Sequence, residues 1–207
     1  MEKINITIRT YAQIITFLVI WVLIIIITDS YSVNDFWPIA KQIPLAISIS
    51  ALVRFIFVKR IWRWKIFQGW LIKIPDLEGT WKGQLKSDWI NPETRKGIDP
   101  IPMILVIRQT FSSIQITLMT KESESYSTTA DFCCPYSEKD IHLAYNYTNR
   151  PKTTIRDRSA IHYGAAILKI IKQPNLMLEG EYWTSRKTRG EISLKFDSKK
   201  LVDQFSE

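Results

Sequence analysis

The chain has 207 residues, a formal net charge of +8 and 46% hydrophobic residues. Nine Lys and Arg against three Asp and Glu fall in residues 1–74, whereas nineteen against seventeen fall in residues 75–207. The second region therefore lacks the positive field that a long nucleic acid needs, although two or three well-placed bases would serve a small phosphorylated ligand.

The first apolar run, residues 11–28, predicts a transmembrane helix. It is uncharged, and its eighteen helical residues would rise about 27 Å, close to the roughly 30 Å thickness of a bilayer core. A cleaved signal peptide is the alternative. That alternative is disfavoured because the run is long for a signal sequence and no small-x-small cleavage site follows it.

The second apolar run, residues 43–58, predicts another span when it is extended back to Pro38. Arg54 lies inside it, about one turn from the end, where a guanidinium can snorkel to the lipid headgroups. A re-entrant or surface helix is the alternative for this run. Residues 1–74 are thus predicted to be a two-helix transmembrane region with a basic juxtamembrane segment.

The flanking charges predict the orientation in the membrane. Bases flank the pair of runs on both outer sides, and the connector at residues 29–40 holds two acids and no base. Positive residues stay inside, so both termini and residues 75–207 are expected in the cytoplasm, with a short loop outside. Trp62, Trp64 and Trp70 are expected to mark the inner interface, beside the bases Lys59, Arg60, Arg63 and Lys65.

Residues 75–207 predict an all-β domain. Short alternating runs rich in β-branched and aromatic residues are separated by polar turns. About eight antiparallel strands closed into a small lipocalin-like barrel would leave no exposed edge. The opening Gly79-Thr80-Trp81 is similar to the first strand of lipocalin-like barrels, where a Trp plugs one end. The predicted strands are residues 80–89, 101–110, 113–121, 126–133, 141–148, 161–171, 176–184 and 190–196.

Alternation also predicts which side chains face the barrel interior. His162 and Gly164 would lie beside Tyr145, Tyr147 and Tyr182. This grouping suggests a pocket with a polar lining and some free volume, since a barrel of this size can hold side chains or one small ligand. A filled core whose tyrosine hydroxyls are satisfied locally fits the same periodicity.

Catalysis finds little support in the sequence. Only two histidines exist, and the two cysteines are adjacent, a spacing that matches no recognised metal site. No phosphate-cradling glycine loop or nucleophile motif occurs. We therefore expect no enzymatic activity, no metal and no cofactor.

Several motifs carry a resemblance to a known family. They are the two apolar runs, Asp76-Leu77-Glu78-Gly79-Thr80-Trp81, the stretches at residues 143–151 and 180–190, and His162-Tyr163-Gly164. Together they resemble the two-transmembrane β-barrel effectors of bacterial cyclic-oligonucleotide anti-phage signalling (CBASS), also described as SMODS-associated β-strand-rich effectors. The resemblance covers nearly the whole chain.

The resemblance implies a function. A cyclic nucleotidyltransferase would make a cyclic oligonucleotide after infection, and we expect a cyclic dinucleotide. The barrel would bind it, the protein would form a homo-oligomer, and the spans would disrupt the lipid of the bacterial inner membrane, so that infection aborts.

The chemistry of such a ligand suggests the binding residues. Aromatic faces stack bases, and arginines meet phosphates. From the alternation of inward and outward side chains, and from their chemistry, we expect Tyr145, Tyr147 and Tyr182 to stack the bases. Arg150, in a long polar loop at 149–160, and Arg186, in a hairpin, are expected to meet the phosphates. Asn149, Thr184 and His162 are expected to read base edges or sugar. Either arginine could instead lie free in solvent.

Two other functions remain open from the sequence. One is a membrane-tethered lipocalin-like barrel that binds a lipid or another hydrophobic ligand. The other is a protein-interaction module on a membrane anchor.

Overall fold

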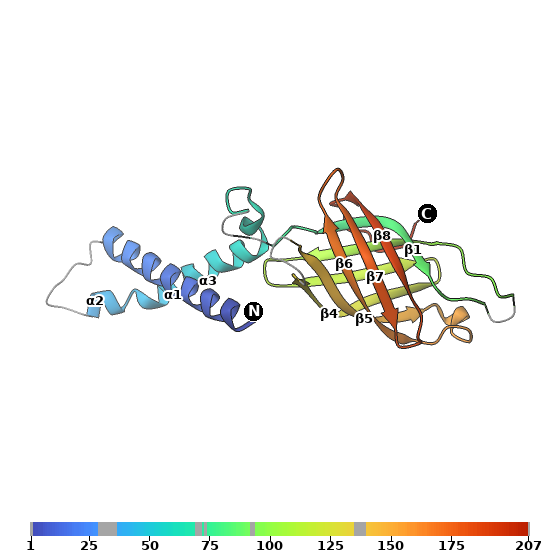
Figure 1. Ribbon diagram of the computed structural model, residues 1–207. Helices are drawn as coiled ribbons and strands as arrows, with labels where there is room; N and C mark the ends of the chain where they lie inside the picture. The colour runs from blue at the N-terminus through green and yellow to red at the C-terminus, as the bar shows by residue number, and fades with distance from the viewer. Residues whose placement is uncertain are drawn as a thin grey trace. The chain divides into compact units, whose positions relative to one another are not determined.

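The computed structural model describes residues 2–28, 37–68, 72, 74–91, 94–134 and 140–206, with the backbone alone for residues 2–12. The chain divides into two compact units, Met1–Ile72 and Lys73–Glu207. The first unit is helical and the second is a β-barrel (Figure 1). The predicted boundary at residue 75 lies close to this division.

The helical unit holds α1 (Glu2–Ile27), α2 (Trp37–Ala40), α3 (Ile43–Lys59) and the short 3-10 helix η1 (Ile61–Arg63). The helices α1 and α3 contact each other, and Ala46 of α3 is fully buried. At one end of this pair, Gln42 Nε2 donates a hydrogen bond to Thr28 Oγ1 at 2.8 Å. A small residue and a polar pair therefore join the two helices.

One helical stretch among the described residues, Trp37–Lys59, is long and apolar enough to cross a membrane. It matches the second predicted span. The first predicted span falls on α1, where Gln13–Ile27 is a shorter apolar helix, so that span stays a prediction.

A compact turn segment, residues 59–68, follows α3, and we call it the knot. Trp62 is fully buried, and Gln68 Nε2 donates to the Trp62 carbonyl at 2.9 Å. The ring of Phe67 packs edge-on against Phe57 of α3, with centroids 5.9 Å apart. A fully buried ring is not exposed to lipid as an interface marker would be, so Trp62 differs from the expectation, whereas Trp64 is exposed and Trp70 lies outside the described residues.

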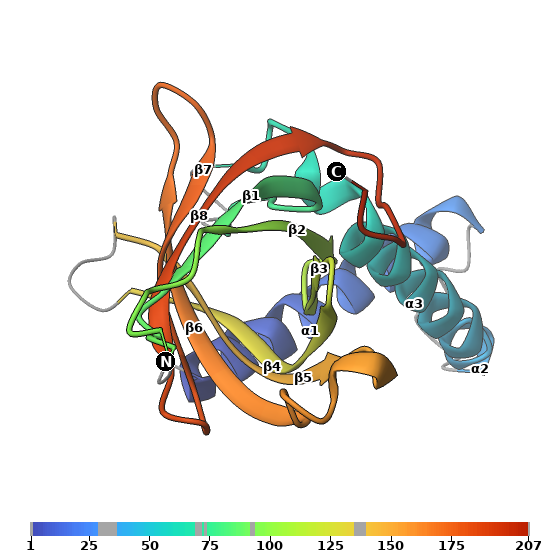
Figure 2. The ribbon, with the colours of Figure 1, turned by 90° about the vertical axis from the view of Figure 1, so that its right-hand side faces the viewer.

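The second unit is a closed antiparallel barrel in which each strand pairs with its neighbours in sequence and β1 pairs with β8. The predicted eight-stranded barrel is confirmed. Figure 2 shows the strands arranged around a common interior, which side chains fill. The strands are β1 (Gly79–Ser87), β2 (Ile101–Gln109), β3 (Ile114–Thr120), β4 (Ser123–Cys133), β5 (His142–Pro151), β6 (His162–Ile171), β7 (Met177–Thr184) and β8 (Arg189–Ser198).

Most strand ends differ from the prediction by one or two residues, and two strands, β4 and β5, differ by three. The strand β4 begins three residues early, at Ser123, and its pairing with β5 shifts between Ser127 and Thr129. A bulge adds one residue to a strand, so a strict two-residue alternation cannot describe it. The strand β5 runs on to Pro151, which shortens the predicted polar loop and places the 3-10 helix η2 (Thr153–Ile155) within it.

A buried tryptophan closes one end of the barrel, as predicted. Trp81 is fully buried, donates from Nε1 to the Leu77 carbonyl at 3.0 Å and meets the Phe196 ring edge-on at 5.3 Å. The Gln109 side chain accepts from Leu77 N at 2.8 Å and donates to the Pro75 carbonyl at 2.9 Å. The chain segment that enters β1 is thereby fixed across this end, which we call the plugged end.

A C-terminal strap, residues 199–206, covers part of the barrel exterior. Ile104, Val106 and Met119 form an apolar patch on the outer side of β2 and β3 and are almost fully buried. The residues packed against that patch are Leu201, Val202 and Phe205. Arg108 Nη2 meets Asp203 Oδ1 at 2.9 Å, and Thr80 Oγ1 donates to the Lys200 carbonyl.

Candidate functional site at the open end of the barrel

Three tyrosines fill the barrel interior toward the end opposite Trp81. Tyr145, Tyr147 and Tyr182 are 4%, 8% and 6% exposed, and the rings of Tyr145 and Tyr147 lie 5.8 Å apart. Burial raises the pKa of all three phenols, so each stays protonated. Of the two alternatives that periodicity left open, the filled core is observed at this level, although the Tyr145 hydroxyl has no hydrogen-bond partner among the described residues.

Gly164 makes room for the uppermost ring. Tyr147 and Gly164 are direct partners in the β5–β6 pair. A Cβ on Gly164 would collide with the Tyr147 ring and hydroxyl and would lie 2.8 Å from the Trp183 carbonyl. The glycine is needed because the tyrosine side chain lies across the neighbouring strand.

Above this level, Asn149 and His162 face each other across β5 and β6. The Asn149 amide donates to Ser125 Oγ at 2.9 Å and to Ser123 Oγ at 3.1 Å. Both amide hydrogens are then used, and the side-chain carbonyl oxygen is left as the acceptor. Two serines of β4 thus hold this amide in one orientation.

His162 is held as a neutral imidazole. Burial lowers its pKa, the nearby Arg186 lowers it further, and the hydrogen bond to Ala160 opposes the shift. The Nδ1 atom lies 2.9 Å from the Ala160 carbonyl, which can only accept, so Nδ1 carries the proton. The other ring nitrogen, Nε2, is then an acceptor that can take a hydrogen bond from a ligand N–H or O–H.

Thr184 and Arg186 belong to the turn between β7 and β8. The Thr184 hydroxyl lies 2.7 Å from the Thr188 hydroxyl and accepts from Arg186 N at 3.2 Å. The exposed Arg186 guanidinium donates from Nη1 to Ser159 Oγ at 2.7 Å. Thr184 therefore shapes the turn, and Arg186 joins it to the connection between β5 and β6.

The prediction placed Arg150 wrongly. It lies within β5, not in a loop, and pairs across the sheet with Glu124 of β4. Its charge also acts on Tyr126, whose hydroxyl donates to Glu124. Because inward and outward side chains alternate, Arg150 belongs to the outer face of the barrel, opposite in parity to Asn149.

The open end, or mouth, is rich in basic residues. Four connections lie at this end, β1–β2, β3–β4, β5–β6 and β7–β8. Their described residues carry four acids, Asp88, Asp99, Glu122 and Asp157, of which Asp88 pairs with Arg189 and Glu122 with Arg158. The bases in the same connections are Arg95, Lys96, Lys121, Lys152, Arg156, Arg158, Arg186 and Lys187. Such a rim attracts an anionic ligand.

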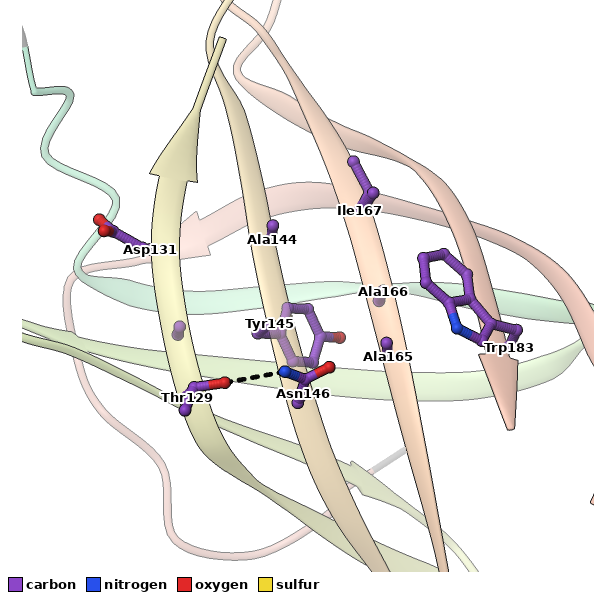
Figure 3. A pocket seen from close by; sticks show the side chains of 10 residues that line it. Thr129, Asp131, Ala144, Tyr145, Asn146, Ala165, Ala166, Ile167 and Trp183 are labelled. Atoms are coloured by element: carbon purple, nitrogen blue, oxygen red, sulfur yellow. Dashed lines mark hydrogen bonds between the residues drawn. The ribbon is translucent and has the colours of Figure 1, made fainter. Parts of the chain in front are cut away.

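A shallow pocket of about 450 Å³ lies on the outer face across β4 to β7 (Figure 3). Ala144 and Ala165 lie between Trp183 on one side and the hydrogen-bonded pair Asn146 and Thr129, 3.0 Å apart, on the other. Asp131 is the one charged residue among those that line it. Phosphates would therefore meet repulsion in this pocket and attraction at the mouth.

A second pocket of about 440 Å³ lies beside the ends of β7, β8 and β1. Two of its charged residues, Arg189 and Asp88, bind each other at 2.9 Å. Acids outnumber bases among its described lining residues, so it suits phosphates less well than the part of the mouth around Arg186 and the β5–β6 connection. No group of His, Cys, Asp and Glu side chains in the described part of the chain is arranged to hold a metal ion.

The structure thus brings together Tyr147, Asn149, His162, Thr184 and Arg186 at the mouth, with Tyr145 and Tyr182 in the core beneath them and Arg150 outside. Sequence analysis missed Ser123, Ser125 and Ser159. The first two precede the predicted start of their strand. A polar residue at an inward position beside a predicted pocket is the signal that could have found them.

Comparison with known proteins gives the mouth a context. A family model described as the Cap15 cyclic dinucleotide receptor domain matches residues 72–196. CD-NTase-associated protein 15 of Staphylococcus schleiferi is 26% identical over 86% of this chain and 91% of its own length. The protein of the same name from Escherichia albertii is 25% identical over 72% of this chain and 74% of its own length. Since the model matches more than half of the residues, this chain belongs to the Cap15 cyclic dinucleotide receptor family.

Proposed function

We propose that the mouth binds a cyclic dinucleotide and that the chain is a membrane-anchored effector of bacterial anti-phage defence. The observation that carries this proposal is the coincidence of a basic, polar mouth with a receptor family match that spans the whole barrel. The CD-NTase-associated names of two relatives support a functional link to a cyclic nucleotidyltransferase.

The mouth offers the contacts that such a ligand needs. A cyclic dinucleotide has two phosphates and two bases, and Arg186 can meet a phosphate oxygen with a charge-assisted hydrogen bond. The Asn149 carbonyl oxygen and His162 Nε2 can accept from base or ribose hydrogens. Tyr147 is the inward-facing aromatic ring nearest the mouth on which a base can stack, with Tyr145 and Tyr182 beneath it.

Binding would then drive assembly and membrane damage. A ligand shifts an equilibrium only if it binds the assembled state more tightly than the resting state. In this proposal α1 and the stretch Trp37–Lys59 both span the inner membrane, with both termini and the barrel in the cytoplasm. Confinement to a membrane raises the effective concentration of protomers, so modest ligand coupling suffices to form an oligomer that disrupts the bilayer and aborts infection.

The binding step is tested by calorimetric titration of the full-length chain in lipid nanodiscs with a panel of cyclic dinucleotides. Arg186→Ala should weaken binding about tenfold or more, because a charge-assisted bond contributes roughly 1.5–3 kcal/mol. Arg150→Ala is the matched control and should bind normally, since that side chain lies outside the barrel. Equal losses for both variants would contradict the site.

The rival carrier function is tested in the same assay. Binding of a fatty acid instead of any cyclic nucleotide would favour the lipid-binding alternative. For the membrane step, cells that express the chain with a cognate synthase should admit an impermeant dye. Dye entry without the synthase would count against a messenger trigger.

A further inference from the structure

The knot displays an apolar tip among basic side chains, and we infer that it binds the anionic phospholipid headgroups of the leaflet where α3 ends. This inference rests on the proposal that Trp37–Lys59 crosses a membrane. It adds a lipid partner that the cyclic dinucleotide site does not involve.

The tip is apolar and is held rigidly. Trp64 and Ile66 are 58% and 67% exposed, while the neighbouring Trp62 is fully buried. Backbone hydrogen bonds from Phe67 N to the Trp64 carbonyl at 3.0 Å and from Gln68 N to the Lys65 carbonyl at 3.3 Å fold the tip into a tight turn. Together with the contact between the Phe67 and Phe57 rings, these bonds fix the tip, so the exposure of these two side chains is not a consequence of a loose chain.

The position of the tip explains its exposure. The knot begins at Lys59, the last residue of the stretch that can cross a bilayer. Tryptophan is enriched at the headgroup level because its ring is apolar and its N–H is polar. Trp64 and Ile66 would therefore enter the interfacial layer beside the end of α3.

The charges of this region select an anionic surface. Lys59, Arg60 and Lys65 are exposed, and residues 37–75 contain no Asp or Glu that could neutralise them. Basic residues just beyond a span are attracted to negatively charged lipids. Among the described residues, none of these three cations forms an ion pair, and an anionic lipid would supply one.

Arg54 can add a fourth contact from within the span. Its side chain is exposed, and it lies five residues before Lys59, a rise of about 7.5 Å along the helix. A long guanidinium side chain can snorkel over such a distance to the phosphate layer. There it can bind a lipid phosphate with two parallel hydrogen bonds.

Charge also decides between lipid and a second copy of the chain. Another copy would bring the same bases to the same surface, and like charges at close range repel each other. An anionic headgroup layer satisfies both the cations and the apolar tip. We therefore assign the surface to lipid.

Spin labelling of the full-length chain tests this assignment. A label at Ile66→Cys, in a Cys133→Ser and Cys134→Ser background, reports depth through its collisions with a water-soluble nickel chelate and with oxygen. In vesicles of phosphatidylcholine with phosphatidylglycerol, we expect chelate collisions several-fold lower than in phosphatidylcholine alone. A label at the exposed Thr154→Cys of η2 is the control and should collide freely in both.

Charge variants sharpen the test. Arg60→Gln with Lys65→Gln should abolish the difference between the two lipids, whereas Lys82→Gln with Lys195→Gln on the outer face of the barrel should retain it. Cosedimentation with vesicles verifies that each variant is still inserted. No messenger is added, so failure of cyclic dinucleotide binding would leave these results unchanged.

Three outcomes would overturn the inference. The label at residue 66 could collide with the chelate as freely as the control does, which would place the tip in water. It could be shielded equally in both lipids, which would remove the role of anionic headgroups. It could show spin–spin broadening that disappears on dilution with unlabelled chain, which would identify a second copy as the occupant.

Discussion

The two ends of the barrel use the same strands for different purposes. At the plugged end, Trp81 and Leu77 are buried and the Gln109 side chain is fully hydrogen-bonded to the incoming chain. At the mouth, His162 and Asn149 occupy inward positions that an apolar side chain could fill, and Arg186 bridges two loops. The plugged end therefore contributes stability, and the mouth contributes polar groups that the core does not need.

This difference predicts that substitutions at the two ends separate stability from binding. The largest expected effect is at the plugged end. Trp81→Ala should lower the free energy of unfolding by about 3–5 kcal/mol, because it leaves a large cavity and removes a buried hydrogen bond. Urea denaturation measures the loss. The folded fraction should still bind messenger with normal affinity, and a specific loss of affinity would contradict the assignment of function to the other end.

Gly164→Ala should lower both the stability of the barrel and its affinity for the messenger. The added methyl group would collide with Tyr147, and overpacking of this kind costs about 1–3 kcal/mol. Displacement of the ring should also weaken messenger binding. Gly97→Ala is the matched control, because a Cβ there meets nothing within 4 Å. A Gly164→Ala variant with normal stability and affinity would show that the Tyr147 ring has no fixed role.

Acidification should weaken messenger binding through His162. Its pKa is lowered in the folded chain, so protonation occurs only below the ordinary range near 6.5, and it removes the Nε2 acceptor. We expect about a tenfold loss of affinity, or about 1.4 kcal/mol, as pH falls through that lowered value. Titration calorimetry across pH measures it, and His162→Gln should flatten the profile.

The lowered pKa of His162 also makes the stability of the fold depend on pH. The unfolded chain binds the proton more readily than the folded chain, so the free energy of unfolding falls as pH drops from 6.5 toward the folded pKa. Thermal melts of the wild type and His162→Gln separate this effect from the loss of binding. An unchanged pH profile in the variant would assign the effect to another group.

The smallest expected effect is a gain in stability. The Tyr145 hydroxyl is buried and has no hydrogen-bond partner among the described residues, so Tyr145→Phe should raise the free energy of unfolding by about 1 kcal/mol. Tyr182→Phe is the matched control and should destabilise, since it loses a hydrogen bond with Ser87. If Tyr145→Phe weakened messenger binding, the site would reach deeper than the Tyr147 level.

The sequence predicted most of the barrel because its strands alternate strictly. Glu179 and Glu181 of β7 must face water, and this requirement alone fixed the inward set that contains Leu178 and Tyr182. The prediction failed where alternation fails. Because β4 begins earlier than predicted and contains a bulge, the prediction missed Ser123 and Ser125. Because β5 is longer than predicted, Arg150 lies on the outer face of a strand and not in a loop.

The candidate site was less predictable than the fold. The alternation of side chains along a strand identifies which residues face inward, but it cannot tell whether a layer of the barrel interior is filled by side chains or left open. The Tyr147 ring lies against Gly164 across two strands, a contact that depends on the register of their pairing. Likewise, the bond between Arg186 and Ser159 joins two loops whose proximity follows from the closure of the barrel.

The C-terminal strap has a practical consequence for the choice of fragment in biochemical work. The family match ends at residue 196, which invites truncation there. Such a fragment would lack Leu201, Val202 and Phe205, so the apolar patch of Ile104, Val106 and Met119 would be exposed to solvent. A contiguous apolar face of this kind promotes aggregation. A receptor fragment that retains residues 197–206, with any affinity tag placed at its amino end, should remain soluble where the shorter one precipitates.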